Sequence, residues 1–353
     1  MMSVEIFETI TLINPDQWNG LTEGQPFATW QWLQADEALS GDGQARYVLL
    51  TNHGDLQAGA VCSVQSRFHS RLLQASFGWL PRHFPYVRCD MPFFLNSGLF
   101  FADPTQCNRL LPELLAAVKT VATQERALFY SFDHLLVVDP AWPFLQRQNL
   151  HCIQHISEAY LEICWASQAA YLDSLSDPSR EEYLHIQELL KQQSILIETA
   201  VPTAEDPTAL HRLICEFALQ NKKPHQFPRD FFSTAFTLLG LSSKLIVARQ
   251  NHHLLGCLVL LQDARQWLIR WPGLATEHAL RAEVYSAMLA ASIQQVILAK
   301  GQRLYLGVID PHALQNLGAT FEKRFGLTAV RNRPLHWLAG KLLKFTANPD
   351  AVH

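Results

Sequence analysis

Short strand-like runs alternate along the chain with longer segments of helical periodicity. Apolar and β-branched residues predict strands at 46–50, 128–132, 244–248, 254–261 and 303–308. Segments rich in Ala and Leu, around 114–121 and at 279–300, predict helices that lead into two of these strands. A mixed, twisted sheet flanked by helices accommodates this order, so we expect an α/β fold of the α+β layered kind.

Five Asp-Pro pairs mark expected helix starts, because an Asp carboxylate can accept a first-turn N–H and Pro is tolerated at the first helical position. These pairs lie at 103–104, 139–140, 177–178, 206–207 and 310–311. Two of them end a [VI]-[VI]-D-P motif, at 137–140 and at 308–311.

The order of elements around the two motifs repeats. Each half has a helix, a strand, the motif, a short helix and a return strand, expected near Cys152 in the first half and at 327–330 in the second. This predicts tandem copies of one α/β unit, an N-terminal unit at 1–155 and a C-terminal unit at 156–353. In the second copy, the polar turn 249–253 predicts a β-hairpin, and 266–270 predicts a third strand.

Composition and charge exclude several classes of protein. The chain has 353 residues, of which 48% are hydrophobic, so it is not disordered. A net charge of −4 argues against a dedicated nucleic-acid binder. The most apolar stretch, 254–261, has the length of a strand and not of a membrane span. The N-terminus carries acids where a signal peptide has Lys or Arg, so we expect a cytoplasmic protein.

Familiar catalytic signatures are absent from the sequence. The seven cysteines form no C-x-x-C pair, and there is no P-loop and no Gly-x-Ser-x-Gly motif. His151 and His155 flank Cys152, but we expect a loop entering a strand there and no zinc site. We therefore expect no metal and no permanently bound cofactor.

Several stretches in the second half resemble the GNAT acyltransferase superfamily. They are 159–163 followed by 171–176 and Arg180, the helix 288–301 that ends in Gly, and the terminal element Phe321-Glu322-Lys323-Arg324-Phe325-Gly326. The tandem arrangement is similar to the Fem-type peptidyltransferase branch of that superfamily. The resemblance covers about 155–335, and it extends only weakly over the first 150 residues.

The resemblance implies a bacterial N-acyltransferase. It would move an acyl group directly from a thioester donor, acyl-CoA or acyl carrier protein as co-substrate, to the primary amine of a small molecule or peptide. Positioning and oxyanion stabilisation supply much of the rate in such enzymes, so few side-chain signatures are needed. An aminoacyl-tRNA donor is disfavoured, because Glu322 stands where the Fem-type branch usually has Lys and because Glu181, Glu182 and Glu188 are acidic. A catalytically silent module that binds a ligand or partner is the alternative from another class, since Phe321 replaces the tyrosine acid of many GNAT enzymes.

The donor-binding candidates come from two places. Arg270, Gly273 and Ala275 fit the spacing of the superfamily's pyrophosphate loop. However, Pro272 removes an N–H donor, the helix is expected to begin several residues later, and a plain turn is the favoured explanation of one glycine. Lys323 is the other candidate. It lies one residue beyond the usual Lys position, which on a helix would turn its side chain by about 100°.

Four residues are candidates for catalysis: Glu283, Tyr285, Tyr305 and Asp310. Glu283 is placed to act as a base, but an acid in a first helical turn also complements the helix dipole. Tyr285 shares a helix face with Leu289, which also fits core packing. Asp310 follows a central strand and also suits an N-cap, and Tyr305 could face the cleft or a helix.

The segment 77–101 has the densest mixture of aromatic and charged residues in the first half. From it we select Trp79, His83, Tyr86, Arg88 and Asp90 as acceptor-binding candidates. Two prolines make it a stiff loop before a strand, and such loops often form recognition surfaces. In Fem-type relatives the acceptor binds in a groove between the units, and this loop would form one wall. An amphipathic loop covering a sheet edge is the alternative.

Overall fold

The chain divides into two compact units. The computed structural model describes residues 2–23, 25–39, 43–66, 83–91, 96–155, 157–220, 227–263, 265–275, 277–307, 317–332 and 334–337. One unit comprises Met1–Glu23, Phe27–Ile156 and Lys323–His353, and the other comprises Gly24–Pro26 and Ser157–Glu322.

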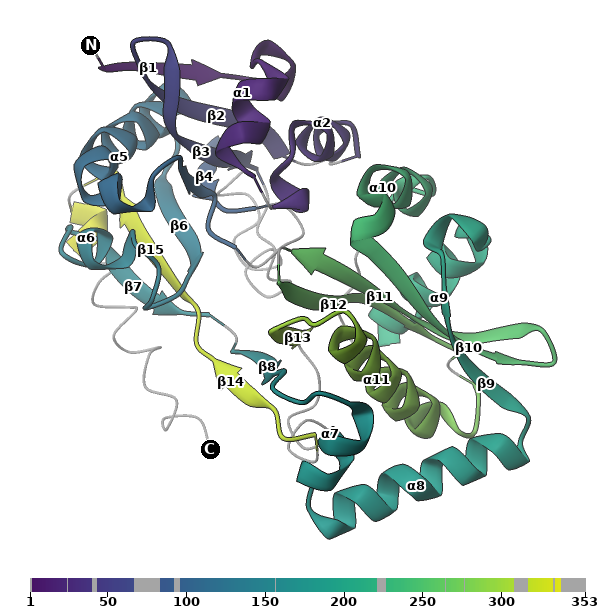
Figure 1. The fold of residues 1–353 in the computed structure, drawn as a ribbon. Helices are drawn as coiled ribbons and strands as arrows, with labels where there is room; N and C mark the ends of the chain where they lie inside the picture. Colours follow the sequence, from purple (N-terminus) through teal and green to yellow (C-terminus); the bar gives the residue numbers. More distant parts are fainter. Residues whose placement is uncertain are drawn as a thin grey trace. The chain divides into compact units, whose positions relative to one another are not determined.

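The first unit is built on a mixed sheet in the order β1-β2-β3-β4-β6-β15-β7, with β5 also paired to β3 (Figure 1). Its strands are β1 (Met2–Phe7), β2 (Gly43–Asn52), β3 (Asp55–Gln65), β4 (Tyr86–Cys89), β5 (Leu99–Phe101), β6 (Phe129–Leu135), β7 (His151–Gln154) and β15 (Phe325–Val330). Its helices are α1 (Pro15–Leu21), α2 (Trp30–Leu39), α5 (Cys107–Gln124) and α6 (Trp142–Gln146). The amphipathic α5 buries one apolar face against this sheet.

The second unit repeats this plan in the order β9-β10-β11-β12-β13-β8-β14. Its strands are β8 (Glu158–Glu162), β9 (Ile195–Ala200), β10 (Ser243–Gln250), β11 (His253–Asp263), β12 (Gln266–Leu274), β13 (Arg303–Gly307) and β14 (Thr320–Glu322). Its helices are α7 (Gln168–Ser174), α8 (Asp177–Gln192), α9 (Pro207–Gln220), α10 (Phe231–Leu239) and α11 (Arg281–Leu298). The expected hairpin at 249–253 is the β10–β11 turn, and the predicted long helix is α11.

The matching orders confirm the predicted repeat and also reveal an exchange of strands. Each sheet contains one strand that the chain enters directly from the other unit. This strand lies between two other strands of the sheet to which it belongs. In the first unit this is β15, between β6 and β7, and in the second it is β8, between β13 and β14. Each sheet is therefore complete only with a segment that continues from the other unit.

This exchange corrects two expectations. The C-terminal unit does not extend over 156–353, because β15 pairs with β6 and β7 and thus belongs to the first unit. The expected return strand at 327–330 is therefore not the counterpart of β7, a place that β14 takes. Glu322 is the last residue of β14 and Lys323 lies between β14 and β15, so the helical turn of about 100° expected between their side chains does not apply.

The Asp-Pro pairs start helices at some positions and not at others. Asp103 and Asp206 accept first-turn N–H bonds, from Thr105 and Thr208, at 2.9 Å each. At α8 the cap is Ser176, one residue earlier than predicted. Asp139 instead accepts the backbone N–H of Leu136 at 2.7 Å, closing the turn before α6. Asp310 lies outside the described residues.

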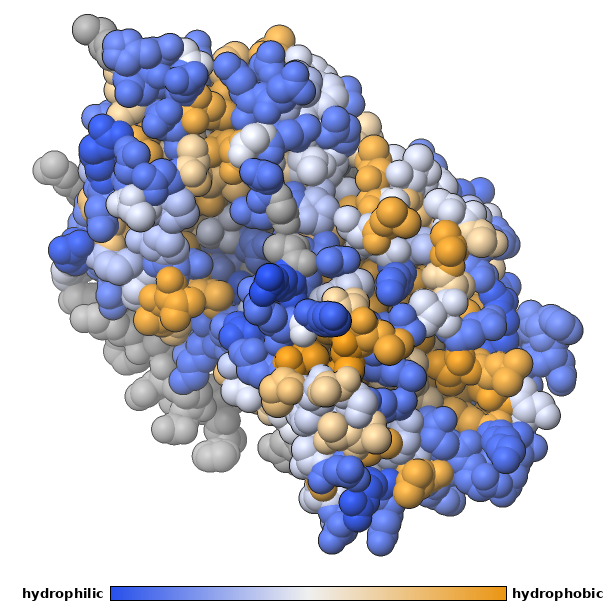
Figure 2. All heavy atoms as spheres, viewed as in Figure 1, coloured by the Kyte–Doolittle hydropathy of each residue, from blue (hydrophilic) through white to orange (hydrophobic). Residues whose placement is uncertain are grey.

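Two further observations concern membrane-spanning helices and the surface of the second unit. Among the described residues, no helix is both long and apolar enough to cross a bilayer. Figure 2 shows apolar side chains gathered near the edge strand β9, where 66% of Leu196 is exposed.

We expect Leu327→Ala to destabilise the first unit. Leu327 on β15 is only 1% exposed and packs in the first unit's core, so truncation should cost about 2–5 kcal/mol of unfolding free energy. Amide hydrogen exchange should then rise in β6 and β7 but not in β10 and β11. The exposed Thr320→Ala on β14 is the control. Equal loss of protection in β10 and β11 would contradict the assignment of β15 to the first unit.

Candidate functional site

The second sheet opens between its two parallel strands. β12 and β13 pair at only three positions, Gln266↔Arg303, Trp267↔Leu304 and Leu268↔Tyr305. Beyond Leu268, β12 continues to Leu274, whereas β13 ends at Gly307, whose φ is +77°. Among the described residues, the later part of β12 therefore has no strand partner on this side. We call this opening the second fork.

A bulge in β12 accompanies the second fork. The register with β11 shifts between Cys257 and Val259, and Trp271 has a φ of +46°, which is rare for a bulky residue. Edge-to-face contacts with Phe231 and Phe232, at 5.2 Å and 5.6 Å between ring centroids, hold the indole. Aromatic packing thus stabilises a backbone conformation that costs energy locally.

A buried ion pair lies at the second fork. Arg270 on β12 donates from Nη2 to Glu158 Oε1 at 2.9 Å, and from Nη1 to the carbonyl of Ile269. Glu158, on β8, is fully buried, and the Arg270 side chain is 11% exposed. A Cβ at Gly307 would lie 3.9 Å from Arg270 Nη1. The arginine thus passes the end of β13 and reaches β8, the strand beyond it.

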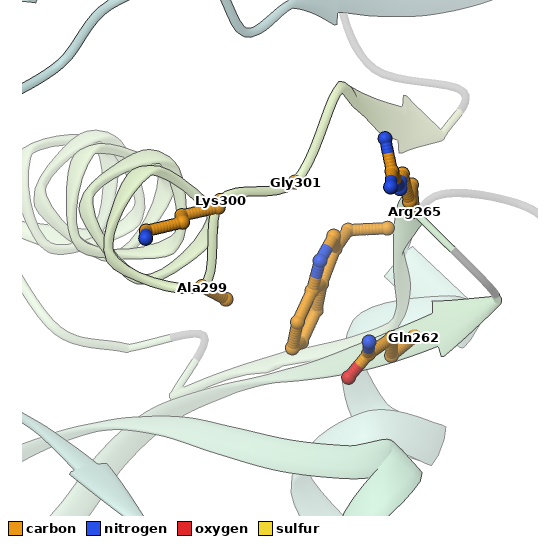
Figure 3. Close-up of a pocket in the computed structure, with 6 residues that line it drawn as sticks. Gln262, Arg265, Ala299, Lys300 and Gly301 are labelled. Atoms are coloured by element: carbon orange, nitrogen blue, oxygen red, sulfur yellow. The ribbon is translucent and has the colours of Figure 1, made fainter.

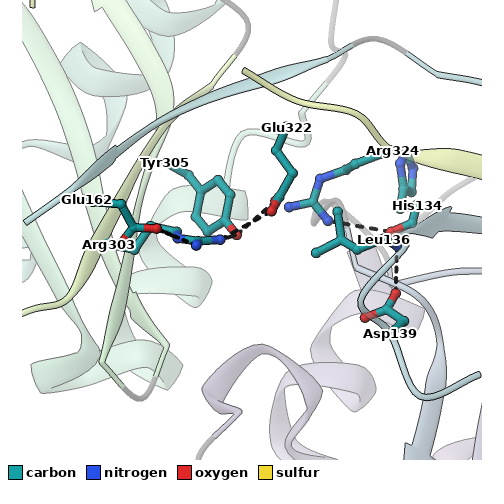
Figure 4. Close-up of polar contacts among 8 residues, drawn as sticks. All are labelled: His134, Leu136, Asp139, Glu162, Arg303, Tyr305, Glu322 and Arg324. Atoms are coloured by element: carbon teal, nitrogen blue, oxygen red, sulfur yellow. Dashed lines mark hydrogen bonds and ion pairs between the residues drawn. The ribbon is translucent and has the colours of Figure 1, made fainter. Parts of the chain in front are cut away.

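A second polar network lies on the same unit. Tyr305 on β13 is buried and donates its hydroxyl hydrogen to Glu322 Oε2 at 3.0 Å, while Arg303 Nη1 donates to the Tyr305 oxygen at 3.1 Å (Figure 4). Arg303 also pairs with Glu162 and with Glu322. Its guanidinium carbon lies 4.3 Å from the ring centroid of Tyr160. Tyr305 therefore sits in a chain of groups that can pass a proton.

The other catalytic candidates are not brought to this network. Glu283 is half-buried in the first turn of α11. Tyr285 stacks on Phe217 at 6.1 Å, and burial raises the pKa of its phenol, as the packing interpretation predicts. Asp310 lies outside the described residues. The catalytic roles of all four candidates stay predictions.

Two of the donor-binding candidates lie on a strand. Arg270 and Gly273 belong to β12, and α11 begins only at Arg281, several residues after the candidate loop, as the sequence indicates. The donor-binding role of these residues stays a prediction. A Cβ at Gly273 would lie 2.8 Å from Cys257 Sγ, so this glycine serves close packing. Ala275 follows β12 and donates its N–H to the Leu255 carbonyl. Lys323 is exposed and belongs to the first unit.

The first sheet has an opening of its own. β4 and β6 run parallel and pair at Val87↔Tyr130, Arg88↔Ser131 and Cys89↔Phe132, after which β4 ends. Arg88 donates from Nε to Asp133 Oδ2 at 2.9 Å and from Nη2 to Asp90 Oδ2 at 2.5 Å. We call this opening the first fork. Two of the acceptor candidates, Arg88 and Asp90, therefore meet there.

The remaining acceptor candidates are dispersed. Tyr86 is buried on β4 and stacks on Phe129 at 4.7 Å, and burial raises its pKa to about 12. It is therefore a core residue of the first sheet. His83 is exposed ahead of β4. Trp79 lies outside the described residues.

A pocket of about 360 Å³ lies at the end of β12 remote from the fork (Figure 3). Residues at and beside the β11–β12 turn and residues just after α11 line it: Gln262, Arg265, Trp267, Ala299, Lys300 and Gly301. Gly301 is required there, because a Cβ would lie 2.7 Å from the Trp267 ring. The fork opens at the other end of β12, so this pocket is not where the transfer chemistry is expected.

Sequence reasoning missed several members of these clusters. Glu158, Arg303, Asp133 and His155 lie far in sequence from their partners, and only pairing across the sheets brings them together. The alternation of Arg303 and Tyr305 along one strand face was the available signal. Within the described ranges, no group of three or more His, Cys, Asp or Glu residues is arranged to hold a metal ion.

Comparisons with known proteins identify the fold. No protein-family model matches the chain, and no curated protein matches it in sequence. The structure of FemX is similar, with a TM-score of 0.61 and 12% identity over 95% of this chain and 100% of FemX. The C-terminal DUF2156 domain of a putative lysylphosphatidylglycerol synthetase from Agrobacterium fabrum gives 0.57 and 11%, covering 94% of this chain and 95% of that domain.

A third solved structure is a tandem GNAT protein from the clavulanic acid biosynthesis pathway. Its TM-score is 0.55 with 12% identity, over 94% of this chain and 99% of that protein. At such identities the likeness concerns the fold. It confirms the expected fold, tandem GNAT-like units with mixed sheets flanked by helices, and its Fem-type resemblance.

Removing one partner of the buried pair should destabilise the second unit. In Glu158→Gln, the mostly buried Arg270 loses its countercharge, and we expect a loss of about 3–5 kcal/mol in unfolding free energy. The double variant Glu158→Leu with Arg270→Met should recover most of it. Urea denaturation measures all three proteins. A single variant as stable as the wild type would show that the pair is not buried in solution.

The first fork predicts a pH-dependent stability. Burial raises the pKa of Asp90 to about 6, although Arg88 lowers it, whereas an unfolded Asp titrates near ~3.9. The folded state holds this proton more tightly, so stability is lost as the pH rises from about 4 to about 7. Relative to Asp90→Asn, the wild type should lose roughly 2–3 kcal/mol over that range. Denaturation at several pH values measures this, and a constant difference between the two proteins would contradict it.

Proposed function

We propose that the protein is an N-acyltransferase that moves an acyl group from a thioester donor, acyl-CoA or acyl carrier protein, directly to a primary amine. The observation that carries the proposal is the second fork, where β12 parts from β13 and, among the described residues, has no strand partner on that side. Backbone N–H groups there can bind a carrier arm and polarise a carbonyl. The tandem GNAT-type fold, shared with solved acyltransferase structures, supports this.

The reaction needs little from the side chains. The amine nitrogen attacks the thioester carbonyl, a C–N bond forms, the C–S bond breaks, and the thiol leaves with a proton. The Tyr305 hydroxyl, held between Arg303 and Glu322, is the group we assign to protonating the leaving sulfur. The nitrogen loses a proton as the C–N bond forms, and the Glu322 carboxylate can accept that proton and return it to the Tyr305 oxygen. Arg270 is engaged by Glu158, so we assign it to holding the fork and not to the donor's phosphates.

An aminoacyl transferase is the second candidate. The resemblance to FemX and to a lysylphosphatidylglycerol synthetase domain favours it. However, Arg303 is paired with Glu162 and Glu322, so these charges offer little to a polyphosphate chain. The thioester donor therefore remains our first proposal.

Variants of Tyr305 test the assignment. We expect Tyr305→Phe and Glu322→Gln to lower kcat on the order of 10²-fold, with KM for the donor little changed, because both act in proton transfer. Glu181→Gln, at an exposed position of α8, is the control. Mass spectrometry with acyl-CoA, acyl carrier protein or charged tRNA as donor, and a mixture of amines as acceptors, measures product.

Coenzyme A binding separates the candidates further. A ligand that binds only the folded state at about 100 times its Kd stabilises it by about 2.7 kcal/mol, so coenzyme A should raise Tm. Transfer from charged tRNA alone would establish the second candidate. Coenzyme A binding without product from any donor would favour a binding module, and no binding together with no product would overturn the proposal.

A further inference from the structure

A histidine and an aspartate meet over a glycine in the first unit. His155, just after β7, places Nε2 3.4 Å from Asp133 Oδ1 on β6. β15 runs between these strands, with Gly326 at the crossing point. A Cβ at Gly326 would lie 2.4 Å from His155 Nε2 and 2.8 Å from Asp133 Oδ1. Any larger residue would therefore separate the pair.

Asp133 is fixed by its other contacts. Its Oδ2 accepts from Arg88 Nε at 2.9 Å and from Ser131 Oγ at 3.2 Å, which leaves Oδ1 to His155. Burial alone would raise the pKa of Asp133, but the His155 hydrogen bond and the Arg88 charge hold it at about 2. An ionised carboxylate accepts the Nε2 hydrogen of His155. The Nδ1 lone pair is then available, and the orientation is that of a base held by a carboxylate.

Two further groups at the first fork lack a complete set of partners. Asp90 gives one oxygen to Arg88, and no described residue donates to the other. His134 has a φ of +59° and a buried Nδ1 without a hydrogen-bond partner, and its ring lies 5.2 Å from that of His155 (its position is labelled in Figure 4). Burial lowers the pKa of His134 to about 3, so it is neutral.

We propose that this cluster binds the ammonium group of a primary amine, with Asp90 as its counter-ion and His155 as the base that accepts its proton. The proton passes from R–NH3⁺ to His155 Nδ1, which leaves R–NH2 with its lone pair and an imidazolium next to Asp133. An anionic ligand fits poorly, because Arg88 already serves both carboxylates. The inference rests on the proposed function in one respect, which is that the nucleophile of the proposed reaction is a primary amine.

Binding can be measured without a donor. In the full-length protein with 15N-labelled histidine, butylamine is titrated while long-range 1H–15N spectra follow each imidazole, and butanol is the neutral probe of matching shape. We expect the His155 signals to show the Nε2–H tautomer and to move saturably with butylamine but not with butanol. No movement of His155 with butylamine would overturn the proposal.

Variants separate the roles of the cluster. Gly326→Ala should abolish the tautomer preference and weaken butylamine binding about tenfold, the change that 1.4 kcal/mol gives. Gly20→Ala, where a Cβ meets nothing within 4 Å, should change neither. If Gly326→Ala does not fold, Asp90→Asn is used instead. We expect Asp90→Asn to keep the Nε2–H tautomer of His155 and to lose affinity for butylamine. Unchanged affinity in a folded Gly326→Ala or Asp90→Asn protein would contradict the site.

The base role has its own readout once transfer is observed. His155→Gln should lower kcat on the order of 10²-fold and flatten its pH profile, whereas His185→Gln on exposed α8 should do neither. Butylamine binding without transfer from any donor would reject the proposed function and leave the binding site standing. Transfer at an undiminished rate in His155→Gln would reject the base.

Discussion

Parting two parallel strands exposes backbone groups that a continuous sheet would pair. A buried N–H or C=O without a partner costs free energy, so a fork is stable only where other contacts hold the strands apart. In the second unit three features do so: the left-handed turn at Gly307, the bulge at Trp271 with its aromatic packing, and the Arg270–Glu158 pair. The chemistry we propose depends on this one opening.

The two forks use the same principle with different side chains. Each has an arginine from the last strand before the opening, Arg88 or Arg270, paired with a mostly buried carboxylate from another strand. In the second fork that carboxylate forms an ion pair with its arginine. In the first it belongs to a larger cluster that includes two histidines and a second aspartate. The two copies of the repeated unit thus have different clusters of charged and polar side chains at their forks.

Local patterns predicted the repeated elements well. Hydrophobic periodicity and turn residues indicated the β10–β11 hairpin, α5, α11 and the repeat. They could not indicate that β15 leaves the second unit, because Leu327 and its neighbours are equally suited to any buried strand. The continuation of β12 beyond Arg270 could not be indicated for a related reason. Arg270, Pro272 and Gly273 have the composition of a loop, and only pairing with β11 and packing against Cys257 make them a strand.

Tyr305, Arg88 and Asp90 were indicated by the sequence as candidates, because chemistry and position coincide there, and their functional roles stay predictions. Their partners were not indicated, since Glu158 is 112 positions from Arg270 and Asp133 is 45 from Arg88.

The central claim is that the second fork receives the donor. Amide hydrogen exchange with and without a non-reactive thioether analogue of acyl-CoA tests it most directly. Protection should increase in 269–274 and 303–307, and protection confined to the pocket around Gln262 and Gly301, or none at all, would contradict it.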